Sequence, residues 1–192
     1  MDFFKKIFSS KSKSYDDLQD QDSLNEKEKM TEDERFVYHF VQKGGQFFYP
    51  DDMDDFKDEL LKLLKFLKVD EFAVVEREYF HFLEKLGIPV KYSFQDEDVL
   101  LGGCESLIAE DGAIMTTSKN TSEYRNSELP KRRVIIALSK QITPTKSQAL
   151  IDINKKYEKP PANIQTMSMF APPKNDLSGG RWYETYLFLI EN

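Results

Sequence analysis

Residues 106–117 read Ser-Leu-Ile-Ala-Glu-Asp-Gly-Ala-Ile-Met-Thr-Thr, two short apolar runs separated by Glu110-Asp111-Gly112. An Asp-Gly pair between such runs favours a tight turn, because both central residues of the turn need a positive φ. The stretch therefore predicts a β-hairpin near residues 105–117. A polar loop over 118–127 follows, and it leads to the aliphatic strand that we expect at 134–138.

Helical and strand patterns alternate before this hairpin. Apolar residues at helical spacing predict helices that begin near Thr31, Asp51 and Glu76. Short apolar runs predict the intervening strands at 46–49, 72–75 and 89–94, and after the hairpin region a helix at 147–157 and strands at 163–170 and 182–190 follow, the last of them alternating. Because the connections are short, this succession predicts a single α/β domain with a mainly parallel sheet flanked by helices.

Composition excludes several classes of protein. The 192 residues suit one domain and can build a sizeable core. The single cysteine, Cys104, excludes an intrachain disulfide framework, a Cys-rich zinc site and an iron–sulfur cluster held by this chain alone. With only two histidines, His39 and His81, we expect no metal site and no cofactor. The 34 acidic and 27 basic residues, without a basic stripe, argue against nucleic acid as a partner.

The chain is predicted to have two parts, a flexible N-terminal segment at 1–30 and an α/β domain at 31–192. The first segment contains a short amphipathic helix whose apolar face comprises Phe3, Phe4, Ile7 and Phe8. This helix either packs on its own domain or serves as a docking peptide for a partner or a membrane surface. No apolar run reaches the roughly 18 residues of a transmembrane segment, and the charged start is not a signal peptide. We therefore expect a cytoplasmic protein.

Candidate ligand-binding residues gather around the hairpin. Glu110 stands at a strand end and Gly112 in the tight turn, where an α/β sheet can expose functional groups. Arg125 can hold a carboxylate or phosphate bidentately, and Thr117 and Asn120 can add polar contacts. Both charged residues also have a structural alternative. The carboxylate can bind the amides of the turn, and the guanidinium can fix its loop through an ion pair with a nearby glutamate.

Two other features are assigned no chemistry. Cys104 is followed by Glu105, whose carboxylate raises a thiol pKa and so argues against nucleophilic use. Lys131-Arg132-Arg133 is interpreted as the solvated start of a strand, since three charges do not make a nucleic-acid face. No catalytic constellation is recognised.

An ordered series of motifs resembles the lactate-utilisation (LUD) domain family, in its small LutC/YkgG-like type. It consists of residues 105–114, then Arg125, Leu129-Pro130 and the strand Val134-Ile135-Ile136. The family pattern is an apolar run ending in Ala-Glu-Thr-Gly, a second strand, an Asn/Arg loop, Leu-Pro and an aliphatic strand. The resemblance is most specific over 105–143, and it extends more loosely over residues 35–192.

This resemblance implies an α/β fold of the NagB/RpiA/CoA-transferase-like kind, shared by sugar-phosphate isomerases and formyl-tetrahydrofolate cyclo-ligases. Members of the family accompany iron–sulfur proteins that oxidise L-lactate to pyruvate in bacteria, and its small members have no established activity of their own. It thus implies an accessory component of lactate or organic-acid oxidation, non-catalytic or binding a small anion. The implied partners are iron–sulfur subunits and a small carboxylate or phosphate.

The sequence departs from the family near its end. Where the family has a stretch like Gly-Pro-Ser-x-Thr-Ala-Asp, residues 167–176 keep only Ser168 and Asp176 as possible counterparts. Losing the glycine removes a close backbone approach to an anion. Two alternatives therefore stay open. One is an acyl- or phosphate-ester-type enzyme that uses Glu110 as nucleophile or base and Arg125 as anion holder. The other is a structural or regulatory module whose pocket has decayed.

Overall fold

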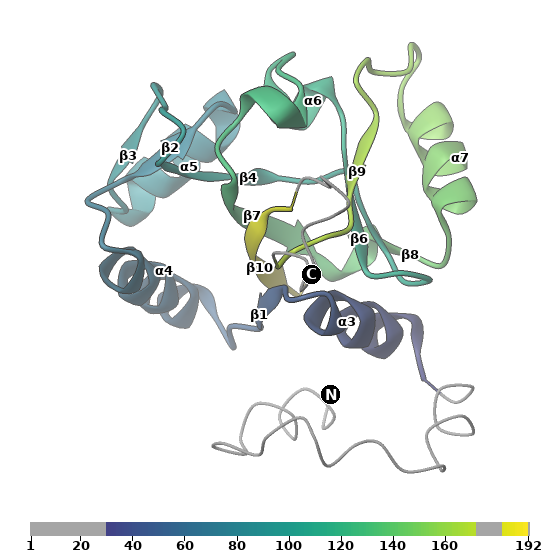
Figure 1. The fold of residues 1–192 in the computed structure, drawn as a ribbon, viewed down its shortest axis with the longest axis horizontal. Helices are drawn as coiled ribbons and strands as arrows, with labels where there is room; N and C mark the ends of the chain where they lie inside the picture. Colours follow the sequence, from purple (N-terminus) through teal and green to yellow (C-terminus); the bar gives the residue numbers. More distant parts are fainter. Residues whose placement is uncertain (1–29, 172–181, 192) are drawn as a thin grey trace, which may run out of the picture.

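Two β-sheets organise the computed structural model, which describes residues 30–171 and 182–191 (Figure 1). All pairs of neighbouring strands in the six-stranded sheet are parallel. Its order is β1 (Gln46–Phe48), β10 (Glu184–Ile190), β7 (Arg132–Leu138), β4 (Val99–Gly103), β2 (Phe72–Val74) and β3 (Val90–Lys91). The predicted α/β fold with a mainly parallel sheet is confirmed.

Three helices on the two sides of this sheet match the predicted patterns. They are α3 (Glu32–Gln42), α4 (Met53–Leu67) and α5 (Arg77–Leu86). Thr31 and Glu34 form a capping box that starts α3, and the Asp52 carboxylate accepts two backbone N–H groups at the start of α4. None of the described helices has the length and apolar character needed to cross a membrane.

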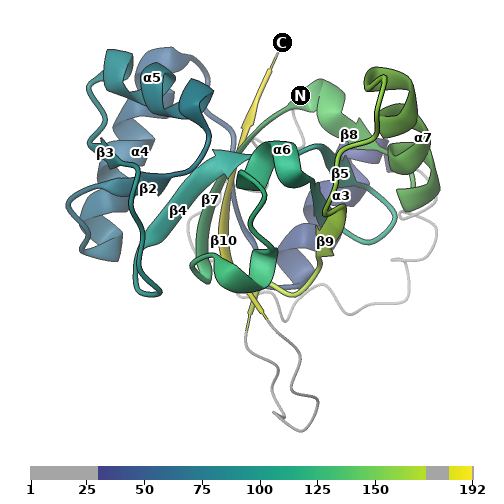
Figure 2. The same cartoon turned by 90° about the horizontal axis from the view of Figure 1, so that it is seen from above.

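The sheet buries a different core on each face. Alternate residues of β7 and β10, such as Ile135 and Leu187, pack with Phe36 and Phe40 of α3. The intervening residues pack with the leucines of α4 and α5. Figure 2 shows α4 and α5 on one side of the sheet and α3, with the second sheet, on the other. Because both faces are covered, the described residues of β10 are almost all buried rather than alternating as predicted.

The second sheet contains the predicted hairpin. Its order is β8 (Ile142–Thr143), β5 (Ser106–Ile108), β6 (Ala113–Thr116) and β9 (Gln165–Met167), and β5 pairs with β6 antiparallel. Gly112 has φ +65° in the turn, and a Cβ there would overlap the backbone of α3. Apolar residues of α7 (Lys146–Lys156) cover the other face of this sheet. The predicted polar loop holds α6 (Ser118–Thr121) and a 3₁₀ turn, η2 (Asn126–Glu128).

Strand β4 was not predicted from the sequence, yet it defines the switch point of the sheet. It lies between β2 and β7 in the sheet. After β2 the chain moves outward to β3, whereas after β4 it proceeds toward β7 and β10 on the opposite side. The carboxyl ends of β2 and β4 therefore flank a topological switch point, the usual position of a binding crevice in an open α/β sheet.

Arg133 corrects the interpretation of residues 131–133 as a solvated strand start. Its side chain is 2% exposed, because β7 is a central strand covered on both faces. The guanidinium donates to the backbone carbonyls of Pro130 and Asn126 and lies 5.3 Å from the centre of the Tyr183 ring. These bonds satisfy a charge that burial would otherwise leave unpaired.

Other predictions lie outside the described residues. They concern the amphipathic helix with Phe3, Phe4, Ile7 and Phe8, and the counterpart at Asp176. The division of the chain between residues 30 and 31 stays a prediction.

Candidate functional site

A cavity of about 450 Å³ opens at the switch point between the ends of β2 and β4. Residues of α5, α6, the β4–β5 junction and the C-terminal end of α7 line it. Those that carry its chemistry are Glu76, Lys119, Asn120, Glu105, Lys156 and Tyr157. We call this the switch-point cavity.

Glu76 lies at the switch point, because it follows β2 and occupies the N-cap position of α5, where its side chain makes no capping hydrogen bond and is free to bind elsewhere. Its Oε1 accepts the backbone N–H of Gly103, at the end of β4, at 2.7 Å. Burial raises the pKa of Glu76 to about 7, although the bonds from Gly103 and from the Asn120 side chain oppose the shift. This carboxyl group can therefore hold or release a proton near neutral pH.

Two glycines at the end of β4 make room for this arrangement. A Cβ on Gly102 would stand 2.7 Å from Oε1 of Glu76, and a Cβ on Gly103 would stand 2.5 Å from the hydroxyl of Tyr79. The Tyr79 hydroxyl donates to the carbonyl of Ile136 at 3.3 Å, and burial raises the pKa of this phenol. Side chains of α5 thus come close to the backbone of β4 at Gly102 and Gly103, because glycine has no Cβ that would block the approach.

A second carboxylate, Glu105, forms the opposite wall of the cavity. Its side chain is 3% exposed, and its oxygens accept from Nζ of Lys156 at 2.6 Å and from the hydroxyl of Tyr157 at 3.1 Å. Burial disfavours the charge on Lys156, but the hydrogen bond and ion pair with Glu105 outweigh it and raise the pKa of this lysine. Glu105 and Lys156 therefore neutralise each other's charge on this side of the cavity.

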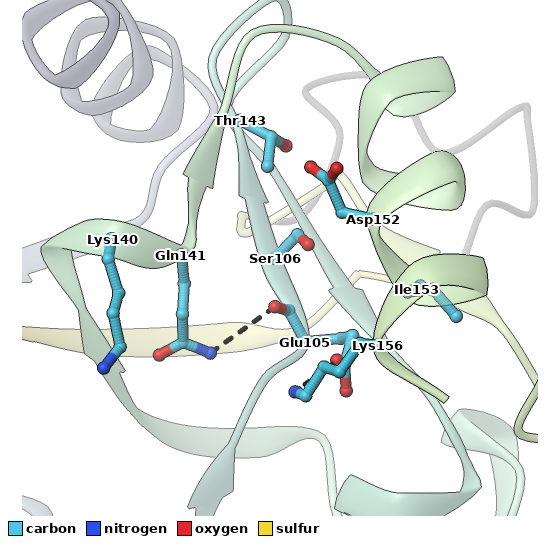
Figure 3. A pocket seen from close by; sticks show the side chains of 8 residues that line it. All are labelled: Glu105, Ser106, Lys140, Gln141, Thr143, Asp152, Ile153 and Lys156. Atoms are coloured by element: carbon cyan, nitrogen blue, oxygen red, sulfur yellow. Dashed lines mark hydrogen bonds and ion pairs between the residues drawn. The ribbon is translucent and has the colours of Figure 1, made fainter. Parts of the chain in front are cut away.

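The same pair also borders a second cavity of about 250 Å³ (Figure 3). Its other lining residues include Lys140, Gln141 and Asp152. Figure 3 shows the Gln141 amide directed toward Glu105, whose carbonyl oxygen lies 3.5 Å from Nε2. The same Nε2 donates to the carbonyl of the preceding residue, Cys104, at 2.6 Å. Gln141 thereby fixes the segment that carries Glu105.

Lys119 brings an ammonium group to the switch-point cavity from α6. The Thr117 side chain caps this short helix, and the Thr117 N–H donates to Oδ1 of Asn120 at 3.1 Å. Within residues 30–171 and 182–191, the Lys119 ammonium forms no ion pair. Lys119, like Arg77 of the same lining, is therefore a cation that an anionic ligand could contact.

The structure separates the five residues that the sequence singled out. Asn120 lines the switch-point cavity, and Thr117 supports it through the cap of α6. Gly112 lies in the hairpin turn against α3. Exposed Glu110 accepts the backbone N–H of Lys146 at the start of α7 at 2.8 Å, and the N–H of exposed Arg125 donates to Glu128 at 2.7 Å. Neither charged residue lines either cavity, and a ligand-binding role for these five stays a prediction.

Sequence reasoning missed Glu76, Glu105, Lys119 and Lys156. Glu76 could have been found, because it directly follows a buried strand and precedes a helix, which is where α/β sheets place functional groups. The Glu105–Lys156 pair joins residues 51 positions apart and has no local sequence signature.

The lone cysteine takes no part in this chemistry. Cys104 is among the lining residues of the cavity but is 5% exposed, and burial, with a contribution from Glu105, raises the pKa of its thiol. Across the described part of the chain, no three His, Cys, Asp or Glu side chains are grouped to hold a metal ion.

These features define an α/β protein with a cavity at the switch point of its sheet, and comparison with known proteins places the fold more closely. No family model and no curated protein matches the sequence. A solved structure described as a DUF162 family protein from Deinococcus radiodurans is similar, with a TM-score of 0.60 over 85% of this chain and 99% of that chain. DUF162 is the LUD domain. At 13% sequence identity this similarity shows the fold, and the fold agrees with the one that the LUD resemblance implies.

Proposed function

We propose that this protein binds a small carboxylate at the switch-point cavity and acts as an accessory component of bacterial L-lactate or organic-acid oxidation. The observation that carries the proposal is a cavity lined both by the Glu76 carboxyl group and by Lys119, an exposed lysine that forms no ion pair within the described residues. In this proposal the carboxylate of a hydroxy acid binds the Lys119 ammonium, and its hydroxyl binds Glu76 or Asn120, which line the same cavity. The volume of about 450 Å³ lies within the range of small-molecule sites.

The accessory role follows from the redox chemistry that lactate oxidation needs. An iron–sulfur cluster needs several thiolate ligands, and this chain has one cysteine, which is buried. We therefore assign electron transfer to iron–sulfur partner subunits in the cytoplasm. The similarity to a DUF162 fold and the motif series of residues 105–143 support this assignment.

Calorimetric titration of the full chain with L-lactate and with pyruvate tests the binding step. We expect the wild type to bind, and Lys119→Ala to weaken binding about tenfold or more, because a charge-assisted contact contributes about 1.5–3 kcal/mol. Lys65→Ala is the matched control, since Lys65 is an exposed lysine on α4 outside the cavity. If neither acid binds, the ligand assignment is wrong and the reading as a module with a decayed pocket gains support.

A growth assay tests the physiological role. Deletion of the gene should slow growth on L-lactate and leave growth on glucose unchanged. Wild-type protein should restore growth, whereas Lys119→Ala should not. Full rescue by Lys119→Ala would separate the growth phenotype from ligand binding at this cavity.

One observation favours a second function, an enzyme in which Glu76 acts as general acid or base. A carboxyl group with its pKa near 7 in a crevice is suited to proton transfer at neutral pH. The geometry thus directs the acyl- or phosphate-ester alternative to Glu76 rather than to Glu110 and Arg125. Turnover of a CoA thioester or a phosphate ester by the wild type, lost in Glu76→Gln, would establish this function over simple binding.

A further inference from the structure

The charged groups around Glu76 leave the switch-point cavity without excess positive charge. The titratable and charged groups that face it from every neighbouring element are Arg77, Glu78 and Tyr79 of α5, Cys104 and Glu105 of the β4–β5 junction, Lys119 of α6, and Lys156 and Tyr157 at the end of α7. With Glu76 ionised, three carboxylates face three cations. With Glu76 protonated, the lining carries one net positive charge.

This difference matters for an anionic ligand, because the cations of the lining offer little excess charge to it. Lys156 is bonded to Glu105 at 2.6 Å, and Arg77 and Lys119 are both exposed. In the proposed function, a carboxylate bound in this cavity shares it with Glu76, whose Oε1 accepts the Gly103 N–H at 2.7 Å. Two neighbouring carboxylates in a partly desolvated site repel each other strongly enough that one of them takes up a proton.

We infer that the cavity takes up a small carboxylate together with one proton, which Glu76 carries. This inference rests on the proposed function and specifies how pH regulates it. The protonated carboxyl can also donate a hydrogen bond to the ligand carboxylate, which an ionised Glu76 cannot do.

The pKa of Glu76 places the coupling between ligand binding and proton uptake near physiological pH. Because burial raises the pKa of Glu76 to about 7, the empty site is largely protonated at pH 6 and largely ionised at pH 8. By linkage, affinity for the carboxylate should be constant below neutral pH and fall about tenfold per pH unit well above it.

The test is isothermal titration calorimetry of the full chain with sodium L-lactate from pH 6 to pH 9. At pH 8 the titration is repeated in two buffers of different ionisation enthalpy, such as HEPES and Tris. We expect uptake of about one proton per lactate at pH 8 and almost none at pH 6. Glu76→Gln should bind with the same affinity at every pH and without proton uptake. Glu84→Gln, an exposed glutamate of α5, is the matched control and should behave as the wild type.

The outcomes separate this inference from the proposed function. If the wild type binds lactate with a pH-independent affinity and no proton uptake, the proton coupling is wrong and the binding function stands. If Glu76→Gln keeps the wild-type pH dependence, another group carries the proton and the assignment to Glu76 is wrong. If the wild type binds no lactate at any pH, both fail. The buffer comparison uses wild-type protein, so it decides whether a proton is taken up even where Glu76→Gln does not fold, and the pH at which uptake begins in the wild type, near 7 if Glu76 is the group, then tests the assignment.

Discussion

Replacing Glu76 by Gln should stabilise the protein at alkaline pH and have a small effect at acidic pH. Folding raises the pKa of this carboxyl group from 4.5 to about 7, so between these values the folded protein holds a proton that the unfolded chain releases. Stability contributed by this proton is complete below pH 4.5 and is lost as the pH rises through 7. At about 1.4 kcal/mol per pKa unit, the full loss is about 3 kcal/mol.

Glutamine does not titrate, yet its amide oxygen can still accept the Gly103 N–H. The free energy of unfolding of Glu76→Gln relative to wild type should therefore increase by about 2.5 kcal/mol between pH 5 and pH 8. Urea denaturation of both proteins at the two pH values measures this difference, and contributions from all other titrating groups cancel in it. Glu84→Gln should show no such change. A relative stability of Glu76→Gln that is the same at pH 5 and pH 8 would refute the argument that Glu76 is held in a desolvated site.

Three further predictions concern the walls of the site and the central strand. Gly103→Ala should lower the melting temperature and cost about 1–3 kcal/mol, because its Cβ would meet the Tyr79 hydroxyl at 2.5 Å; an unchanged melting curve would show that Tyr79 is free to move. Arg133→Met should cost about 2–4 kcal/mol in urea denaturation, since it leaves two backbone carbonyls without their donors and removes the contact with Tyr183; a neutral result would mean that the bonds contribute little. Cys104 should fail to react with a thiol reagent such as DTNB in native buffer and react fully in denaturant, because it is 5% exposed and its thiol pKa is raised; rapid native labelling would contradict its burial.

The sequence predicted most of the fold because the relevant patterns are local. Helices at α3, α4 and α5 each have an apolar stripe and a cap within the same few residues. The hairpin was predictable from Asp111-Gly112 because a turn depends on its own residues, but the expectation of a positive φ at both was wrong: Gly112 has one, and Asp111 does not. The second sheet was not predicted as a separate layer, since its pairing of β5 with β8 and of β6 with β9 joins distant segments.

The candidate site was only partly predictable for the same reason. Asn120 and Thr117 were chosen for their residue type in a polar loop, and the loop does reach the switch-point cavity. Glu110 and Arg125 were chosen by the same reasoning, but the fold directs them to the start of α7 and to η2. Which polar side chains meet depends on strand order, and strand order depends on β4, whose five residues end in two glycines of low strand propensity.

The glycine pair of β4 provides a last test, because Gly102→Ala perturbs Glu76 without removing it. The added Cβ would stand 2.7 Å from Oε1 of Glu76, so the flexible carboxyl end must move away from the Gly103 N–H that it now accepts at 2.7 Å. That bond favours the ionised form and holds the pKa of Glu76 down against burial. Its loss should therefore raise this pKa further.

In Gly102→Ala, the pH-dependent loss of stability should consequently continue above the pH at which it ends in the wild type, near 7. Urea denaturation at half-unit steps from pH 5 to pH 9 measures the pH at which this loss of stability ends. A general packing defect predicts something different, namely a lower stability by the same amount at every pH. A loss of stability that extends to higher pH in Gly102→Ala, but not in the double variant with Glu76→Gln, would show that Gly102 acts through the carboxyl group of Glu76. A uniform loss in both proteins would show that the glycine serves packing alone and that the Gly103 N–H does not set the acidity of Glu76.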